Sequence, residues 1–509
     1  MNQRHALRLS ALSLLLVTGS MIPVLLWCVI EGTPQQIAAA KSLGLTCLLA
    51  AAFILAVWCF LSSNNRRFGR REAFLMVTLT WILAPAVAGL PFLLWAHFFS
   101  PSGSHPFLSP INCYFEAMSG LTTTGASILV DIEALPRGLL LWRSETHWLG
   151  GLGIVLLFVA VLPLMGVTSR KLHSVESTGP LRGDTGPGIR DTARILWISY
   201  LVITVISALA LRTAGLPWFN AVCEAFGAIA TGGFSVRNAS IASYKSPVVD
   251  TIIVIVMIFG AVNFSLYHEL ARGKWRRVWR DPELRALLVL LVVGSVVVVL
   301  SILPTDLHTI AGDAPKRGWL ASIRHGVFNY VSMHTDTGFA TVNFDSWPSP
   351  AILAIVLGTF IGGSAGSTTG GIKVVRFYAA AKILLKQVDT MIRPSVVKPV
   401  RMGGRTLSIE EQSSLLQTII WFVVALVLGT IVLMLIGSST GNVDLRTAFS
   451  ASLVNLCTAG PGLGGVGPTQ NYLWLPDASK LVLCALMLVG RLEIVPVLAL
   501  FHPKFWSST

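Results

Sequence analysis

Long apolar stretches recur along the whole chain, separated by short polar segments. Three of them, Leu12–Ile30, Gly44–Leu61 and Leu284–Leu303, are long enough to cross a hydrocarbon core, which takes about 20 helical residues. Two such helices are expected first, over about 9–30 and 40–62. The rest divides into four units, each with a long apolar helix, a short amphipathic segment, a Gly/Thr loop and a second apolar helix. The pattern predicts an all-α polytopic membrane protein.

The four short segments lie at roughly 108–120, 217–229, 322–334 and 445–456. Stretches of about 10–14 residues are too brief to span and are typical of re-entrant segments. Ten spanning helices are then expected. The predicted organisation is an N-terminal helix pair over 1–65, followed by four pore repeats over 66–180, 181–280, 281–400 and 401–509.

The loops of the four units align without a gap on one glycine each. They read LTTTGAS, IATGGFS, HTDTGFA and LCTAGPG, around Gly125, Gly233, Gly338 and Gly460. The position nine residues earlier is occupied by Glu116, Glu224, Asn329 and Ala451. Four loops in one register, each between two apolar helices, indicate an internal repeat.

Irregular backbone at membrane depth is tolerated only where protein buries it or where it lines a water-filled cavity. Glycine lets the backbone approach a central axis closely. Four loops around a pseudo-fourfold pore predict a ring of carbonyl oxygens that replaces the hydration shell of a monovalent cation. The alternative is that these glycines serve packing or turns in another kind of transporter. The predicted filter comprises Thr123, Thr124, Gly125, Thr231, Gly232, Gly233, Asp336, Thr337, Gly338, Ala459 and Gly460, and the predicted cation ligands are Thr123, Thr124, Thr231, Gly232, Asp336, Thr337, Thr458 and Ala459.

Composition and charge agree with a membrane protein. The chain is 53% hydrophobic and 12% charged. Its net charge of +14 is concentrated in short loops near 66–71, 170–194, 272–285 and 373–405. This asymmetry predicts that the basic loops and both termini are cytoplasmic. Basic loops of this kind attract anionic membrane lipids, and we expect no nucleic-acid binding.

Six segments resemble the TrkH family, the membrane subunits of bacterial Trk K⁺ uptake systems. They are SGLTTTGAS (119–127), ATGGFS (230–235), VSMHTDTGF (331–339), GPGLG (460–464), FIGGSAGSTTGGIKVVR (360–376) and GRLE (490–493). The resemblance covers essentially the whole chain. It implies K⁺ transport across the bacterial inner membrane, a homodimer with one pore per subunit, and a cytosolic nucleotide-binding regulatory subunit (TrkA-like). K⁺ would be the transported ion, and no permanently bound cofactor is expected.

The segment Ile361–Gly371 interrupts an apolar helix with glycine, serine and threonine, so it should unwind and line the cavity. The resemblance implies an intramembrane loop that obstructs the pore below the filter; a small-residue packing face is the alternative.

Arg491 lies inside the last apolar helix, where a charge is costly. The resemblance places it on the permeation path, and a structural pair with Glu493 or a neighbouring helix is the alternative. The predicted gate residues are Gly362, Gly363, Gly366, Gly370, Gly371 and Arg491.

Three carboxylates near the filter need separate interpretations. Glu116 and Glu224 are expected to accept hydrogen bonds from the backbone of the filter loops, with cation attraction as the alternative, because buried carboxylates need partners. Asp336 stands where the other loops have threonine. It points either into the pore, where it would strengthen cation binding, or backward onto a partner such as Arg324 or His334.

Two other functional classes compete with a pore. An H⁺- or Na⁺-coupled cation symporter of the same fold remains the alternative, although coupled transporters are commonly built from inverted repeats and these four units run in one orientation. A membrane enzyme is not expected. Gly462, Gly464 and Gly467 match G-x-G-x-x-G without the strand that a dinucleotide site requires, and no catalytic constellation stands out.

Overall fold

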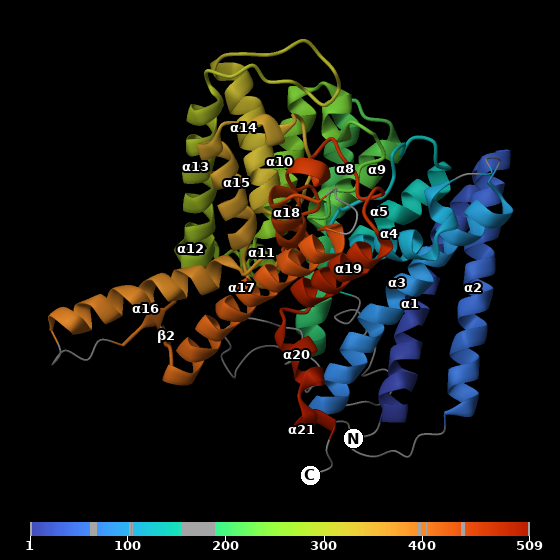
Figure 1. Ribbon diagram of the computed structural model, residues 1–509, viewed down its shortest axis with the longest axis horizontal. Helices are drawn as coiled ribbons and strands as arrows, with labels where there is room; N and C mark the ends of the chain where they lie inside the picture. The colour runs from blue at the N-terminus through green and yellow to red at the C-terminus, as the bar shows by residue number, and fades with distance from the viewer. Residues whose placement is uncertain are drawn as a thin grey trace.

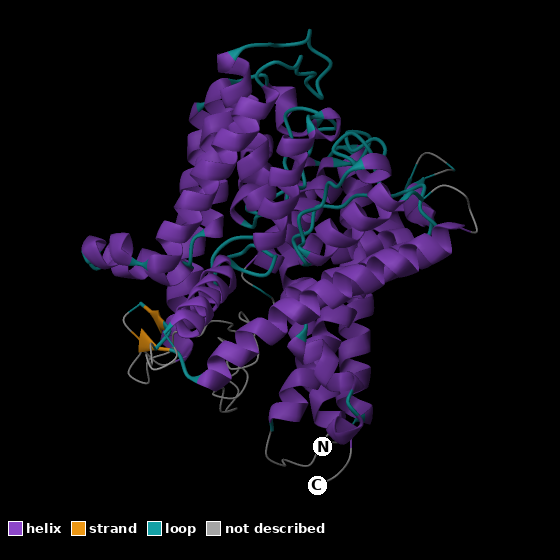
Figure 2. Ribbon diagram, turned by 60° about the vertical axis from the view of Figure 1, so that its left-hand side comes forward, coloured by secondary structure: helices purple, strands orange, loops and turns teal. Residues whose placement is uncertain are grey.

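The structure, a computed structural model, consists of helices and, in its described part, one short hairpin (Figures 1 and 2). It describes residues 3–61, 69–100, 103, 105–151, 153, 189–393, 399–403, 405–438 and 443–506. The basic residues Arg66, Arg67, Arg170, Lys171 and Arg182, and the expected boundaries near 65 and 180, lie outside these ranges.

Six helices in the described ranges are long and apolar enough to cross a membrane. The first, α1, confirms the interpretation of the N-terminal stretch as a membrane-length helix. With α2 it precedes the four repeats, and α3, α8, α13 and α17 each begin one. Their bounds are α1 Gln3–Glu31, α2 Pro34–Phe60, α3 Arg70–Phe98, α8 Ile189–Thr213, α13 Pro282–Ile302 and α17 Ile409–Ser438.

Four short helices follow the first helix of each repeat, as the sequence predicted. They are α4 Pro110–Leu121, α9 Trp218–Ile229, α14 Trp319–His334 and α18 Leu445–Leu456. Local signals set their starts: α4 has proline in its first turn, and the Asp444 side chain caps α18 by accepting from the Thr447 amide. With at most 16 residues, none is long enough to span a bilayer.

The second helix of each repeat follows the short helix. These helices are α5 Arg137–Gly151, α10 Pro247–Ala261, α15 Ser349–Ile361 and α19 Asp477–Arg491. Each short helix packs against both long helices of its own repeat and against the second helix of the preceding repeat. The pairs α5–α9, α10–α14, α15–α18 and α19–α4 close a four-membered ring. The fold is therefore the predicted pseudo-fourfold arrangement.

Breaks in the second helices are more frequent than the sequence predicted. The third repeat breaks as expected, between α15 and α16 (Val374–Ile392). The second also breaks, and α10 meets α11 (Phe264–Ala271) at 97°, where the Asn263 side chain caps α11. In the fourth repeat, Glu493 and Ile494 have positive φ before α20 (Val495–Phe501). Each of these two breaks involves one or two residues, a capping side chain or residues with positive φ. The periodicity of apolar residues therefore does not predict them.

Peripheral elements surround this ring. Helices α1 and α2 pack against α3 and α5 of the first repeat, and α16 projects from the body on the other side (Figure 1). Both termini lie at one end of the molecule (Figures 1 and 2). The remaining elements are η1 Pro106–Leu108, η3 Ser240–Tyr244, α12 Trp275–Arg280, η4 Phe344–Ser346, β1 Arg401–Met402, β2 Arg405–Thr406, η5 Gly464–Val466 and α21 Pro503–Trp506.

Candidate ion-conduction site

The loops that follow the four short helices share one backbone conformation. The residue two before the aligned glycine is left-handed in every repeat, with φ between +50° and +57°, and the glycine follows at +80° to +83°. The intervening residue donates its amide to a carbonyl five residues earlier, at 2.7–2.9 Å, which is how a helix closes on a left-handed residue. Three of the left-handed residues are threonine and one is aspartate, where this conformation is strained. They are Thr123, Thr231, Asp336 and Thr458.

The four aligned glycines lie against one another's loops in cyclic order. A Cβ added to any of them would overlap a carbonyl oxygen of the next repeat, the oxygen of the residue just before that repeat's glycine. The pairs are Gly125 with Gly232, Gly233 with Thr337, Gly338 with Ala459, and Gly460 with Thr124. The fourth pair returns to the first repeat. The loops therefore form a closed ring, with one such carbonyl at each junction between repeats.

One hydrogen bond braces each loop at an equivalent position. The side chain nine residues before the glycine accepts from the amide three residues after it: Glu116 from Ile128 at 2.9 Å, Glu224 from Val236 at 3.3 Å, and Asn329 from Thr341 at 3.3 Å. The fourth repeat has Ala451 there, and the neighbouring Ser450 accepts from Leu463 at 3.0 Å instead. The structure thus gives Glu116 and Glu224 the bracing contacts expected of them.

A buried ion pair strengthens the brace of the first repeat. Arg143 of α5 donates to Glu116 at 2.7 Å, and the two side chains are 2% and 0% exposed. The same guanidinium donates to the carbonyl of Ser235 at 3.0 Å and lies 3.4 Å from the centre of the Phe234 ring. Arg143 therefore links the first filter loop to the second.

We expect Arg143→Met to lower the free energy of unfolding by about 3–5 kcal/mol, because it leaves Glu116 buried without its cation. The exposed pair Arg237–Glu133, at 2.8 Å with both side chains 41% exposed, is the matched control. Arg237→Met should cost less than about 1 kcal/mol. Thermal unfolding of the purified variants in detergent measures both, and equal losses would contradict the assigned bracing role.

The two faces of the ring have different surroundings. A cavity of about 330 Å³ opens on the side of the residues that follow the glycines, and all four aligned glycines line it. The residues that precede the glycines face the segment between α15 and α16. This segment is the intramembrane loop, residues 362–373. The ring thus separates an open cavity from the loop.

The intramembrane loop contacts three repeats directly. The Thr368 hydroxyl donates to the carbonyls of Ile229 and Gly260, both at 3.0 Å, and accepts from the Thr231 hydroxyl at 3.2 Å. The Gly371 amide donates to the carbonyl of Cys457 at 3.2 Å. A Cβ on Gly362 would lie 2.9 Å from the Asp336 carboxylate. The loop is hydrogen-bonded to residues at the ends of the second and fourth short helices and lies against Asp336, after the third, directly before the ring.

The predicted gate glycines have distinct positions in this loop. Gly362, Gly366 and Gly371 have φ of +71°, +71° and +67°, a region that favours glycine. A Cβ on Gly370 would overlap the Cys457 carbonyl, and one on Gly363 would lie 2.7 Å from the Thr369 hydroxyl. The glycines serve backbone conformation and close approach at this contact rather than a helix-packing face.

Arg491 joins the loop to the first repeat. Its guanidinium donates to the Thr368 carbonyl at 2.9 Å and to the Thr123 hydroxyl at 3.1 Å. It also donates to the carbonyls of Gly150 and, at 2.9 Å, Gly151, at the end of α5. The loop and Arg491 together reach all four repeats. Nearby Glu493, suggested from the sequence as a partner of Arg491, forms an ion pair with Arg376 of α16.

Asp336 points toward the intramembrane loop. Its side chain is fully buried, and neither carboxylate oxygen has a hydrogen-bond partner within the described residues. Neither suggested partner bonds to it there: Arg324 pairs with Asp250 at 2.7 Å, and His334 faces the Tyr330 hydroxyl at 3.5 Å. Lys373, in the loop itself, is close enough for its positive charge to act on the Asp336 carboxylate.

Sequence reasoning missed two polar side chains that hold the loop. Lys373 is 5% exposed and donates to the carbonyl of Thr369 and, at 3.3 Å, to its hydroxyl. Glu283 of α13 accepts from the Ala365 amide at 2.6 Å. Lys373 was visible in principle, because an ionisable residue next to an apolar span merits a functional interpretation by default. Glu283 was not, since its partner is 82 residues away.

The described residues hold no group of three or more His, Cys, Asp or Glu side chains that could bind a metal ion. The oxygens at the ring are carbonyls, hydroxyls and one carboxylate.

Comparisons with known proteins cover nearly the whole chain. Residues 48–508 match the TrkH family, described as a cation transport protein. The chain is 36% identical over 513 residues to the Trk system potassium uptake proteins TrkH of Salmonella typhimurium and of Escherichia coli, with 100% of each chain covered. TrkG of Escherichia coli is 33% identical over 458 residues, covering 89% of this chain and 88% of its own length.

A solved structure agrees with these relatives. The crystal structure of the potassium transporter TrkH from Vibrio parahaemolyticus superimposes with a TM-score of 0.82 at 31% identity, covering 100% of both chains. The matched proteins are transporters, which confirms the expectation of a transporter rather than an enzyme. The chain belongs to the TrkH family of cation transport proteins.

Proposed function

We propose that this protein is the ion-conducting subunit of a K⁺ uptake system of the bacterial inner membrane. The observation that supports the proposal most strongly is the closed ring. Its four loops have matching backbone dihedrals, and the glycine of each loop lies against a carbonyl oxygen of the next. The names of the matched relatives, all Trk potassium uptake proteins, support K⁺ as the ion.

The proposed filter works by replacing water with fixed oxygens. The carbonyls of the residues before the four glycines, together with the threonine side chains preceding them, substitute for the hydration shell of K⁺. Each short helix ends at the ring, so the negative end of its dipole lies next to the passing ion. The braces from Glu116, Glu224, Asn329 and Ser450 hold the loops at their spacing.

The proposed gate is the intramembrane loop with Arg491. In the arrangement described, the loop lies against the residues that precede the ring, and Arg491 adds a fixed positive charge between Thr123 and Thr368. A cation leaving the filter would meet both a backbone obstruction and a repelling charge. Opening therefore requires the loop to give up its hydrogen bonds to at least one neighbouring repeat.

Regulation is proposed to act through α16, which continues directly from the loop. A cytosolic nucleotide-binding subunit that moved α16 would also move Gly371 and Lys373, at the junction of loop and helix. Met391 and Ile392, at the far end of α16, are 82% and 71% exposed. Exposed apolar surface of this kind is available to a partner chain. We include a homodimer, with one pore per subunit and both termini cytoplasmic, in the same proposal.

A coupled symporter of the same fold is the rival function. Purified protein in liposomes separates the two, because a pore supports downhill K⁺ flux with no second ion gradient, whereas a symporter needs H⁺ or Na⁺ alongside. We expect K⁺ to enter with equal pH and Na⁺ on both sides. Strict dependence on either gradient would establish coupling and remove the pore proposal.

Asp336→Thr should weaken cation binding at the inner end of the filter, because it gives the third loop the residue found in the other three. Two unit charges about 4 Å apart attract by about 4 kcal/mol at an effective dielectric of about 20. A loss of about one third of that attraction, about 1.4 kcal/mol, corresponds to a rise of about tenfold in the apparent KM for K⁺. Rubidium uptake with Na⁺ as competitor measures both affinity and selectivity. K⁺ and Na⁺ fluxes that match the unmodified protein would refute a role for Asp336 in conduction.

A further inference from the structure

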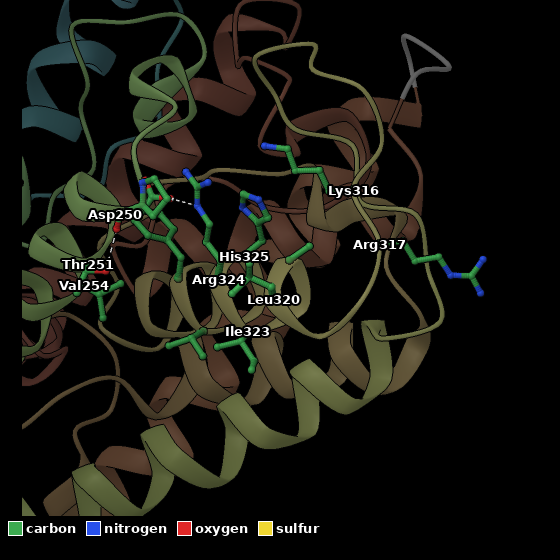
Figure 3. A pocket seen from close by; sticks show the side chains of 13 residues that line it. Asp250, Thr251, Val254, Lys316, Arg317, Leu320, Ile323, Arg324 and His325 are labelled. Atoms are coloured by element: carbon green, nitrogen blue, oxygen red, sulfur yellow. Dashed lines mark hydrogen bonds and ion pairs between the residues drawn. The ribbon is translucent and has the colours of Figure 1, made fainter.

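A second cavity, of about 630 Å³, lies outside the pore between α10 and α14 (Figure 3). One wall is a stripe of α10 formed by Asp250, Thr251 and Val254. The other comes from α14 and from the chain just before it, where Lys316 and Arg317 lie. The volume is in the range of specific ligand sites, about 300–1,000 Å³.

The cavity is polar at one end and apolar along its length. Its head end holds two cationic side chains, Lys316 and Arg324, and one carboxylate, Asp250, and Arg317 lines the cavity nearby. Arg324 donates to Asp250 at 2.7 Å, which leaves the cations in excess. In Figure 3 the Lys316 ammonium points toward Arg324 and His325, and Arg317 points away from them. Within the described residues, Lys316 forms no ion pair, so its charge is available to a ligand at the head end.

The walls below the head end are hydrocarbon and open to the outside. Val254, Ile323, Val327 and Phe328 line them, and Leu320 at the rim is 85% exposed. In a membrane this surface faces lipid tails. A free anion would contact only the polar end, whereas an amphiphile would occupy both the polar end and the apolar walls. The polar end also contains Asp250 Oδ1, which is buried and has no hydrogen-bond partner within the described residues.

We propose that this groove binds one anionic glycerophospholipid whose head group carries a hydroxyl, with phosphatidylglycerol as the chemical type. Lys316 and Arg324 hold the phosphate, since ammonium and guanidinium donors form strong charge-assisted hydrogen bonds to it. A head-group hydroxyl donates to Asp250, and an acyl chain lies along Val254 and Ile323. The α14 wall is the short helix of the third repeat, so an occupied groove supports the helix that ends at His334, two residues before Asp336. This inference goes beyond the proposed function and does not depend on K⁺ being the ion.

The test is lipid titration of the purified full-length protein in detergent, followed by its thermal unfolding midpoint. Ligands that bind the folded state raise the midpoint in a concentration-dependent way. The probes are phosphatidylglycerol, phosphatidylcholine with the same acyl chains, and inorganic phosphate. Each basic residue near an anionic head group contributes about 1 kcal/mol, or about fivefold in affinity. Lys316→Ala should therefore weaken phosphatidylglycerol binding about fivefold and leave the midpoint without lipid unchanged.

A second variant tests the apolar part separately. Ile323→Trp fills the groove and should abolish stabilisation by the lipid while all charges remain. Leu353→Trp, on the exposed face of α15 at a residue 58% exposed, is the matched control. Arg446→Ala, at a residue whose side chain is 47% exposed and outside the basic loops, is the control for charge. Both controls should bind lipid normally.

Three results would overturn the proposal. Equal stabilisation by phosphatidylcholine removes the selection for an anionic head group, and equal stabilisation by inorganic phosphate identifies a free-anion site. Conversion of a dimer to a monomer by Ile323→Trp identifies the groove as an interface between two copies of the chain. None of these outcomes bears on transport through the ring, so they are distinct from failure of the proposed function.

Discussion

Replacing Gly233 with alanine should lower K⁺ uptake at least about 100-fold. The new methyl group would overlap the carbonyl oxygen of Thr337, one of the four oxygens at the ring junctions. It would also meet a backbone φ of +80°, which costs an L-residue about 1–2 kcal/mol. A shift of about 1 Å at a constellation of this kind can cost about 100-fold in rate. Growth of a K⁺-uptake-deficient bacterium at low K⁺, and rubidium uptake by the same cells, measure the loss.

The control for Gly233→Ala is Gly312→Ala. Gly312 also has positive φ, +76°, but its added Cβ would have no atom within 4 Å. Both substitutions impose the same backbone strain, and only Gly233→Ala displaces a neighbouring loop. Normal uptake by Gly312→Ala with loss in Gly233→Ala assigns the effect to the ring. Equal losses in the two variants would attribute it to strain alone and contradict the filter assignment.

Replacing Arg491 with glutamine should raise flux through the unregulated protein about 30-fold. The substitution removes the positive charge below the filter and donors to Thr368, Thr123, Gly150 and Gly151. Hydrogen bonds to charged groups contribute about 1.5–3 kcal/mol each. A shift of about 2 kcal/mol toward the open arrangement corresponds to that increase, because each 1.4 kcal/mol is about tenfold in a population ratio. Rubidium flux into liposomes without any partner subunit measures it.

Two further variants serve as controls for the Arg491→Gln result. Arg491→Lys keeps the charge and loses the forked geometry, so its flux should be intermediate. Arg446→Gln breaks an ion pair with Asp345 in which the arginine side chain is 47% exposed, outside the loop contacts, and should leave flux unchanged. Lower flux in Arg491→Gln at equal protein level would mean that Arg491 supports conduction rather than closure.

Much of the fold could be predicted because it repeats. Four short segments, each too brief to span, recur with one glycine register, and the structure has helices at all four positions. The breaks near Asn263 and Ile494 escaped prediction because each depends on one or two residues. The hydropathy on either side of them remains that of a spanning helix.

The glycines of the candidate site could be predicted, and so could two of its supports, Glu116 and Glu224, but the other supports could not. Glycine is informative because few backbone environments require it. Ser450 was overlooked because it accepts the equivalent hydrogen bond from a position shifted by one residue. The partners of Asp336 were sought among its sequence neighbours, whereas Gly362 and Lys373, which lie on its side of the ring, come from the intramembrane loop. Contacts between distant segments are set by packing, and a single sequence carries little record of them.

The most direct test of the ring is rubidium flux into liposomes containing purified protein, with serine placed at each aligned glycine in turn. The K⁺ gradient is the only driving force, and pH and Na⁺ are equal on both sides. We expect downhill flux with the unmodified chain and its loss, or loss of K⁺ over Na⁺ selectivity, in Gly125→Ser, Gly233→Ser, Gly338→Ser and Gly460→Ser alike. Unchanged flux and selectivity in all four variants would contradict the account.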